Sequence, residues 1–275
     1  MEWSAANQNT RFLYSNAKKF KVCMKITVIT VCYNSAGTIG DTLRSVREQT
    51  YKNIEHIIVD GGSTDRTLAV VATEGAHVAK IVSEKDNGIY DAMNKGIALG
   101  SGEIIGFINA DDFYATSAVL ATVAAAFEAC GADSCYGDLC YVSQTDPSRV
   151  VRYWRSKDFV SGSFESGWCP PHPTFFVRRS IYQKLGGFDL DFKIAADFEL
   201  MARYLESARI NSFYIPDVLV KMRLGGTTNK SLANIWKQNV EIRQALNKLG
   251  LRFSLFKFVL PKLVSRAMQF VKRPG

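Results

Sequence analysis

The sequence predicts an α/β protein built on a parallel sheet, and three observations support this class. Four short apolar segments rich in β-branched residues recur through the first half of the chain. Between them lie stretches in which apolar residues repeat with helical spacing. Of the 275 residues, 47% are hydrophobic and 22% charged, which is typical of a folded globular chain. Strands that alternate with helices form parallel sheets joined by right-handed crossovers.

The first half of the chain is regular. Its predicted strands cover residues 25–32, 54–60, 78–82 and 103–108. Its predicted helices cover residues 38–48, a segment beginning near Asp65, residues 90–99 and residues 116–129. Ser63 or Thr64 is expected to cap the second helix, and Gly100 to close the third.

The second half is less regular, and the pattern there predicts a mixture of elements. The predicted strands cover residues 134–142, 149–154, 174–177 and 210–215. The predicted helices cover residues 179–185, 196–206 and 231–249. A loop dense in Gly, Ser, Cys and Pro is expected at residues 161–173.

The two ends differ from the middle, so we divide the chain into a flexible extension (1–23), a folded domain (24–229) and a C-terminal amphipathic helical region (230–275). The first 23 residues lack apolar periodicity and the apolar core of a secretory signal. No apolar run reaches the roughly 18 residues that a membrane span needs. Six cysteines without a CxxC pair, together with three histidines, argue against a zinc site and favour free thiols in a cytosolic protein.

The C-terminal tail is basic. Residues 251–275 hold six basic residues and no acidic one, within a net charge of +8 for the chain. Residues 251–271 also contain Leu, Phe and Val, which predicts an amphipathic helix bent at Pro261. We expect this helix to lie on an anionic membrane surface, and we expect no nucleic-acid partner. The alternative is a helix packed on the folded domain or on a second subunit.

Acidic residues follow three of the predicted strands. Asp60 ends the second strand, Asp86 follows the third, and Asp111 and Asp112 follow the fourth. In an open parallel sheet, ligands bind outside the carboxyl ends of the strands. Carboxylates gathered there repel one another unless a cation or hydrogen-bond donors intervene, and oxygen-rich sites favour Mg²⁺ or Mn²⁺. The alternative is that such acids cap the following helices, which we prefer for Asp65.

Glycines at the same edge fit a ligand site. Gly61 and Gly62 follow Asp60 and allow the backbone to approach a ligand closely. The chain has no GxGxxG after its first strand and no GxxxxGK[ST], which disfavours a dinucleotide-binding fold and excludes a P-loop.

Three segments together resemble the family-2 group of GT-A glycosyltransferases, in the style of bacterial exopolysaccharide, O-antigen and colanic-acid enzymes. They read TVITVCYNSAGTIGDTLRSVREQTYKNIEHIIVDGGSTDRT, SEKDNGIYDAMNKGIALGSGEIIGFINADD and AADFELMAR, and the likeness covers about residues 25–225. The resemblance implies a GT-A fold, in which a Rossmann-like nucleotide-binding half is continuous with a mixed-sheet acceptor half. It also implies an inverting mechanism with a divalent metal, Mg²⁺ or Mn²⁺.

The resemblance also implies roles for particular residues. Thr30, Cys32 and Asn34 would lie at the nucleotide edge of the sheet. Asp60 would bond the nucleobase, and Asp86 would lie near the base.

For the chemistry itself, the resemblance implies that Asp111 contacts the ribose or the metal shell and that Asp112 is the direct metal ligand. Asn109 stands at the first acidic place of the family's DXD-type motif, which leaves one ligand fewer. Asp197 falls at the general-base position, where Ala196 replaces the usual neighbouring Glu.

Two further residues have open roles. His172, in the rigid loop 168–173, is expected either to contact the diphosphate, metal or acceptor, or to brace the loop. Arg223 lies in the segment 222–228, which resembles the family's donor-closing loop, so it is either a diphosphate contact or a surface arginine beside a hinge. Lys95 is expected to pair with Asp91 one helical turn away.

These expectations together predict transfer of a sugar from a nucleotide-sugar donor, UDP favoured, to an acceptor hydroxyl. The acceptor is expected to be a lipid-linked or other oligosaccharide in surface polysaccharide synthesis, used by a cytoplasmic enzyme peripheral on the inner face of the membrane. The alternatives are a sugar nucleotidyltransferase and a non-catalytic membrane-surface scaffold with a transferase fold. The loop CYNSAGT after the first strand lacks a basic residue, which argues against the nucleotidyltransferase.

Overall fold

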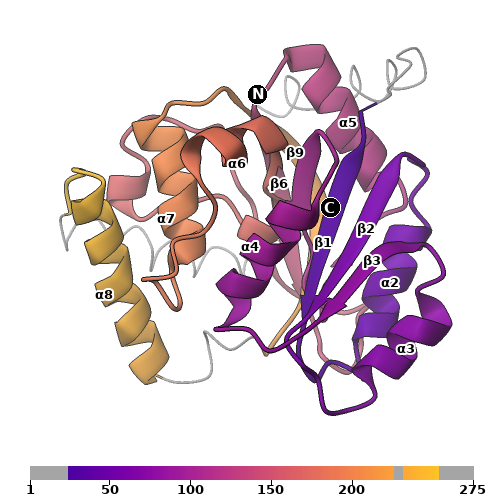
Figure 1. Cartoon of the computed structure of the whole chain (residues 1–275). Helices are drawn as coiled ribbons and strands as arrows, with labels where there is room; N and C mark the ends of the chain where they lie inside the picture. The colour runs from indigo at the N-terminus through magenta and orange to yellow at the C-terminus, as the bar shows by residue number, and fades with distance from the viewer. Residues whose placement is uncertain (1–23, 226–231, 254–275) are drawn as a thin grey trace.

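The computed structural model describes residues 24–225 and 232–253 (Figure 1). The predicted extension 1–23 lies outside this range, as does nearly all of the predicted tail helix 251–271. The predicted boundary at residues 229 and 230 falls in the gap and stays a prediction.

One nine-stranded mixed sheet runs through the described residues, with the order β3-β2-β1-β4-β8-β6-β9-β5 and β7 paired to β6. The strands are β1 Ile26–Cys32, β2 Ile54–Asp60, β3 Val78–Ser83, β4 Ile104–Phe107, β5 Phe113–Tyr114, β6 Ser134–Val142, β7 Val150–Trp154, β8 Phe176–Arg178 and β9 Ser212–Arg223. β1 pairs in parallel with β2 and β4, and β2 with β3, which confirms the predicted parallel half. β8 then joins β4 and β6 in antiparallel pairing, which makes the sheet continuous and mixed.

Helices cover both faces of this sheet (Figure 1). They are α2 Ile39–Arg47, α3 Thr67–Glu74, α4 Ile89–Leu99, α5 Val119–Cys130, α6 Arg179–Leu185, α7 Ala196–Ala202 and α8 Leu232–Lys248. On one face, side chains of α4, α6, α7 and α8 share a single apolar cluster with β1, β2 and β4. On the other face, α2 and α5 pack on the same strands, and α2 and α3 close the end near β2.

The second half differs from its prediction at three places. The predicted strand 174–177 is confirmed in part, because β8 spans Phe176–Arg178 while Thr174 ends a 3₁₀ turn, His172–Thr174. The predicted helix 196–206 continues past α7 as a π-helix, Arg203–Ser207. The predicted strand 210–215 extends to Arg223 as β9, because its pairing with β6 continues past Pro216 through two register shifts. Long-range pairing of this kind leaves no local periodicity in the sequence.

Candidate active site

Asp60 lies at the carboxyl end of β2, in register with Cys32 of β1 and Ser83 of β3. Its Oδ2 accepts hydrogen bonds from the Ser63 backbone N–H at 2.9 Å and from the Ser83 hydroxyl at 2.7 Å. Burial acts to raise the pKa of Asp60, but bonds from Ser63 and Ser83 outweigh it and lower the pKa. Burial and the Asp60 charge raise the pKa of the Cys32 thiol, which stays protonated and donates to Asp60. The acid is therefore a fixed anion at the strand end.

Gly61 places a second carboxylate beside the first. A Cβ at this position would lie well inside van der Waals contact with Oδ2 of Asp86. The other oxygen of Asp86 accepts the Gly88 N–H at 2.9 Å, just before α4. The structure thus brings Asp60 and Asp86 to the same edge, as the sequence predicts, and the glycine is what permits it.

Asn34 and Thr30 make contacts within the protein. Asn34 has a φ of 50°, and its Oδ1 accepts the backbone N–H of Thr64 at 2.9 Å, which ties the loop after β1 to the loop after β2. Thr30 is fully buried, and its hydroxyl bonds Nε2 of His56 at 2.9 Å. His56 in turn contacts His77, with 3.0 Å between ring nitrogens, so contacts within the protein hold both histidines.

The turn after β4 carries the paired acids. The Thr42 hydroxyl of α2 donates to the backbone oxygen of Asp112 at 2.6 Å and of Asn109 at 3.3 Å. The Asp112 side chain has 0% exposure, and burial together with the Asp111 charge raises its pKa well above the ordinary range. Asp112 Oδ1 and Asn109 Oδ1 are buried acceptors without a hydrogen-bond partner. The sequence predicts Asp112 as the direct metal ligand, and such full burial of its side chain was not expected. The neighbouring Asp111 is only partly buried.

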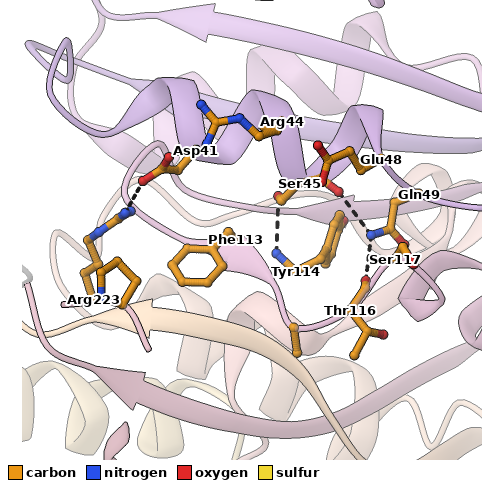
Figure 2. A pocket seen from close by; sticks show the side chains of 12 residues that line it. Asp41, Arg44, Ser45, Glu48, Gln49, Phe113, Tyr114, Thr116, Ser117 and Arg223 are labelled. Atoms are coloured by element: carbon orange, nitrogen blue, oxygen red, sulfur yellow. Dashed lines mark hydrogen bonds and ion pairs between the residues drawn. The ribbon is translucent and has the colours of Figure 1, made fainter. Parts of the chain in front are cut away.

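Arg223, at the end of β9, is buried against this turn. Its guanidinium pairs with Asp41 of α2, donates to the Asp111 backbone oxygen at 2.9 Å and lies 5.1 Å from the Phe113 ring centre (Figure 2). The prediction left two roles open, a diphosphate contact and a surface arginine. A surface position is wrong, because only 6% of the residue is exposed. The same side chain lines a cavity of about 520 Å³ between α2 and β5.

Asp197 lies in the first turn of α7. Its Oδ1 accepts the Tyr90 hydroxyl at 3.1 Å and the Phe198 N–H at 2.9 Å. Glu241 of α8 accepts the backbone N–H groups of residues 194 and 195 at 2.8 and 3.0 Å, just before this helix. A carboxylate at that place satisfies N–H groups that a helix start leaves open. Sequence reasoning did not single out Tyr90 or Glu241.

His172 is buried between two aromatic rings. Its ring centre lies 5.6 Å from Phe107 and 5.4 Å from Phe188. Burial lowers the pKa of His172, and the negative charge of Asp197 acts in the opposite direction. These contacts agree with the loop-bracing alternative, and they also place the imidazole near the Asp197 carboxylate.

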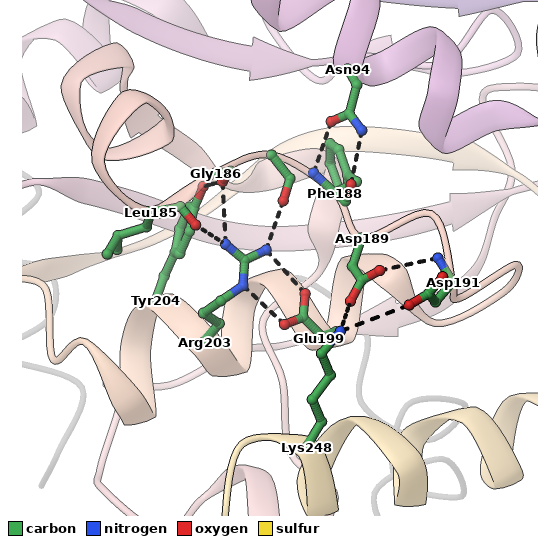
Figure 3. A network of polar contacts seen from close by, with 11 residues as sticks. Asn94, Leu185, Gly186, Phe188, Asp189, Asp191, Glu199, Arg203, Tyr204 and Lys248 are labelled. Atoms are coloured by element: carbon green, nitrogen blue, oxygen red, sulfur yellow. Dashed lines mark hydrogen bonds and ion pairs between the residues drawn. The ribbon is translucent and has the colours of Figure 1, made fainter.

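A polar network holds the turn 186–189 close to α4 (Figure 3). The Asn94 side chain accepts the Phe188 N–H and donates to the Phe188 carbonyl, both at 2.8 Å. Arg203 bonds Glu199 at 2.9 Å and donates to the Gly187 carbonyl at 2.7 Å. The Gly186-Gly187 pair was the only sequence signal for this turn, and it does not reveal the partners.

Comparisons with known proteins identify the family of this chain. The model of the family described as "Glycosyl transferase family 2" matches residues 27–190, more than half of the chain. The chain belongs to glycosyl transferase family 2. It is 36% identical over 180 residues to an uncharacterised glycosyltransferase of Mycobacterium tuberculosis, covering 65% of this chain and 68% of the relative. It is 28% identical over 247 residues to the PGL/p-HBAD biosynthesis glycosyltransferase of Mycobacterium bovis BCG, covering 88% and 93%.

Solved structures show that this family-2 chain has the GT-A glycosyltransferase fold. It superposes on S. aureus TarS with a TM-score of 0.61 and 18% identity, over 83% of this chain and 41% of that one. A mannosyltransferase from Pyrobaculum calidifontis gives a TM-score of 0.55 and 19% identity, over 98% and 90%. The chain is a glycosyltransferase of mixed α/β architecture, as the sequence predicts.

In this glycosyltransferase, Tyr90 connects the two groups of predicted residues. Asp86 precedes α4, and Tyr90 stands in the first turn of that helix and bonds Asp197. Burial and the negative charge of Asp197 raise the pKa of Tyr90 well above the ordinary range, so the phenol stays a donor. Within residues 24–225 and 232–253, no three His, Cys, Asp or Glu side chains form a group suited to a metal ion.

Proposed function

We propose that this enzyme inverts the anomeric centre of a nucleotide sugar, with Asp197 as the general base. The supporting observation is the position of Asp197, a partly buried carboxylate held by Tyr90 next to the helix that follows Asp86. Both hydrogen bonds end at Oδ1, so we assign to Oδ2 the proton of the acceptor hydroxyl. As that proton leaves, the acceptor oxygen bonds the anomeric carbon and the nucleoside diphosphate departs from the opposite face.

The first test is Asp197→Asn. A general base contributes about 10²–10⁴-fold, so we expect turnover to fall by that factor while UDP affinity changes by less than about twofold. Asp191→Asn is the matched control, because that side chain is 87% exposed on the same half of the molecule. Near-normal turnover of Asp197→Asn would exclude Asp197 as the base.

We propose a UDP-sugar as the donor, with Asp60 and Asp86 contacting the nucleoside and Cys32 and Asn34 shaping the edge around it. Supporting a nucleotide-sugar donor, similar structures were solved in complex with UDP, UDP-GlcNAc and GDP-Man. We expect UDP to raise the melting temperature more than GDP does, each measured with and without Mn²⁺. A larger shift with GDP than with UDP would overturn the choice of uracil as the nucleobase of the donor.

We propose that Mg²⁺ or Mn²⁺ binds at the turn Asn109–Asp112. The unpartnered oxygens of Asn109 and Asp112 fit this proposal, because a cation satisfies buried acceptors that lack donors. Asp112 is inaccessible in this conformation and would need the turn to rearrange, so we assign the direct contact to the partly buried Asp111. When bound, the ion would offset the charge of the departing diphosphate.

Two variants separate these carboxylates. Asp111→Asn is expected to abolish the Mn²⁺-dependent part of the thermal shift with UDP and to leave the metal-free shift unchanged. Asp112→Asn is expected to reduce the Mn²⁺-dependent part of the thermal shift only partly, because Asp112 lies beside the ion without contacting it. The opposite ranking would return the direct contact to Asp112, as the sequence predicts.

We propose that the acceptor is a lipid-linked oligosaccharide in surface glycan synthesis, and that the enzyme works on the cytoplasmic face of the membrane. The relative named for PGL/p-HBAD biosynthesis supports a surface role. No helix in the described parts of the chain is long and apolar enough to cross a membrane. Transfer of radiolabel from UDP-sugars to organic-extractable lipid tests the acceptor, and label found only in water-soluble product would contradict it.

A further inference from the structure

The net charge of this protein is concentrated at its C-terminal end. Residues 232–275 hold nine basic residues and one acidic residue, so this segment carries a formal charge of +8. Residues 1–231 hold 25 basic and 25 acidic residues and are formally neutral. The first part of the charged segment is α8, which the structure describes.

The inner face of α8 belongs to the catalytic half. Ile242, Ala245 and Leu246 are buried in the cluster that also holds α7. Glu241, the one acid of the segment, is buried too and bonds the backbone before α7, three residues or fewer from Asp197. In Figure 1, α8 stands beside α7 at the outer edge of the molecule, away from α2 and α3.

The outer face of α8 has a different composition. Trp236 is 71% exposed, and Lys237 and Arg243 are exposed as well. Trp236, Val240 and Arg243 are spaced by four and three residues, so they share one side of the helix. Since Glu241 points inward, this outer face has no carboxylate of its own helix.

Three acids contact the far end of the helix and the residues just after it. Asp189 and Asp191 pair with Lys248, and the Glu165 carboxylate accepts the backbone N–H of Arg252. Lys237 and Arg243 are exposed, although Arg243 also lies 5.9 Å from the ring centre of Phe253, so both cations are charges that this face presents.

We propose that the outer face of α8, formed by Trp236, Lys237, Val240 and Arg243, contacts an anionic lipid bilayer. Tryptophan is favoured at the membrane interface, and each cation near an anionic leaflet strengthens binding about fivefold. Residues 254–275 add five basic residues and no acid to the same end. The inference rests on the proposed function, because a lipid-linked acceptor would then arrive next to the helix that carries Asp197.

Co-sedimentation of the full-length chain with vesicles tests this surface. The vesicles contain phosphatidylcholine alone or with phosphatidylglycerol. For the double variant Lys237→Gln and Arg243→Gln, we expect a partition coefficient on the anionic vesicles about 25-fold below wild type. Trp236→Ala is expected to lower it severalfold.

The matched control is the double variant Lys52→Gln and Lys184→Gln. Both side chains are exposed, Lys52 in the loop after α2 and Lys184 on α6, and both lie away from the α8 face. Its partitioning is expected to equal wild type. The proposal would be overturned if the α8 double variant partitioned onto anionic vesicles like wild type. It would also be overturned if the control lost as much partitioning as the α8 variant. Vesicle-independent self-association that Trp236→Ala abolishes would assign the face to a second copy instead. Hydrolysis of UDP-sugar without vesicles reports on the proposed function separately, and we expect both double variants to retain it.

Discussion

The two halves of the sheet hold their polar groups in different ways. On the nucleotide side, Asp60 is fixed by Ser63 and Ser83, three and 23 positions away, at the ends of adjacent parallel strands. On the acceptor side, the Tyr90–Asp197 bond joins residues 107 positions apart. The first arrangement follows from strand order and short loops. The second exists only after helices from distant parts of the chain have packed, so it should be the more easily broken by single substitutions.

The largest effect is expected at Arg203, on the acceptor side. Glu199 is 2% exposed, and Arg203→Met would leave its carboxylate buried without its partner. The turn carbonyl of Gly187 would lose its donor as well. Breaking a buried pair in this way costs about 3 kcal/mol of unfolding free energy, measured by urea denaturation. Arg149→Met, at an exposed arginine, is the control and should change stability by less than about 0.5 kcal/mol. Equal losses in the two variants would remove the contrast between the halves.

The same contrast explains what the sequence predicts and what it does not. Asp60 and Asp86 were expected at one edge because each follows a strand, and the parallel register places them there. Lys95 pairs with Asp91 at 3.8 Å, as helical spacing predicts, but its closer partner is Glu84 at 2.8 Å, which the spacing does not reveal.

Arg223 and Asp112 show where this reasoning stops. Arg223 is buried because β9 extends past its predicted end and brings the guanidinium against α2, and no local pattern encodes that pairing. Asp112 is buried beneath the turn because Thr42 holds its backbone, a contact between residues 70 positions apart. Motif spacing locates such a turn in the chain, but it does not say which side chain faces out.

The second effect tests the nucleotide side through pH. Burial lowers the pKa of His56 from 6.5 to about 3, so the unfolded chain binds a proton below pH 6.5 that the folded chain does not. The contribution of His56 to the free energy of unfolding is therefore fully present above pH 6.5. It falls by about 1.4 kcal/mol per pH unit below that value. Between pH 6.5 and 5 this amounts to about 2 kcal/mol. His56→Gln should remove that share of the slope in urea denaturation at the two pH values. Parallel slopes for variant and wild type would contradict it.

The third effect separates binding from stability on the same side. Gly61→Ala would press a methyl group against the Asp86 carboxylate and displace it from the strand end. We expect UDP affinity to fall about tenfold, or about 1.4 kcal/mol, by calorimetry. Gly37→Ala is the matched control, because nothing lies within 4 Å of a Cβ there. Loss of affinity in both variants would mean that the loop backbone, and not Asp86, sets the binding.

The last effect tests the link between the halves. Tyr90→Phe removes the hydroxyl that holds Asp197 Oδ1 and the carbonyl of residue 194, while the ring keeps its stacking on Phe188. The phenol donates to a charged carboxylate, and a hydrogen bond of this kind is worth about 1.5 kcal/mol, so turnover should fall about tenfold. The KM for the donor should stay the same, because Asp60 and Asp86 do not depend on the phenol. A fall in donor affinity without a fall in turnover would place Tyr90 with the nucleotide side, and the acceptor side would then have to hold Asp197 through α7 and α8 alone.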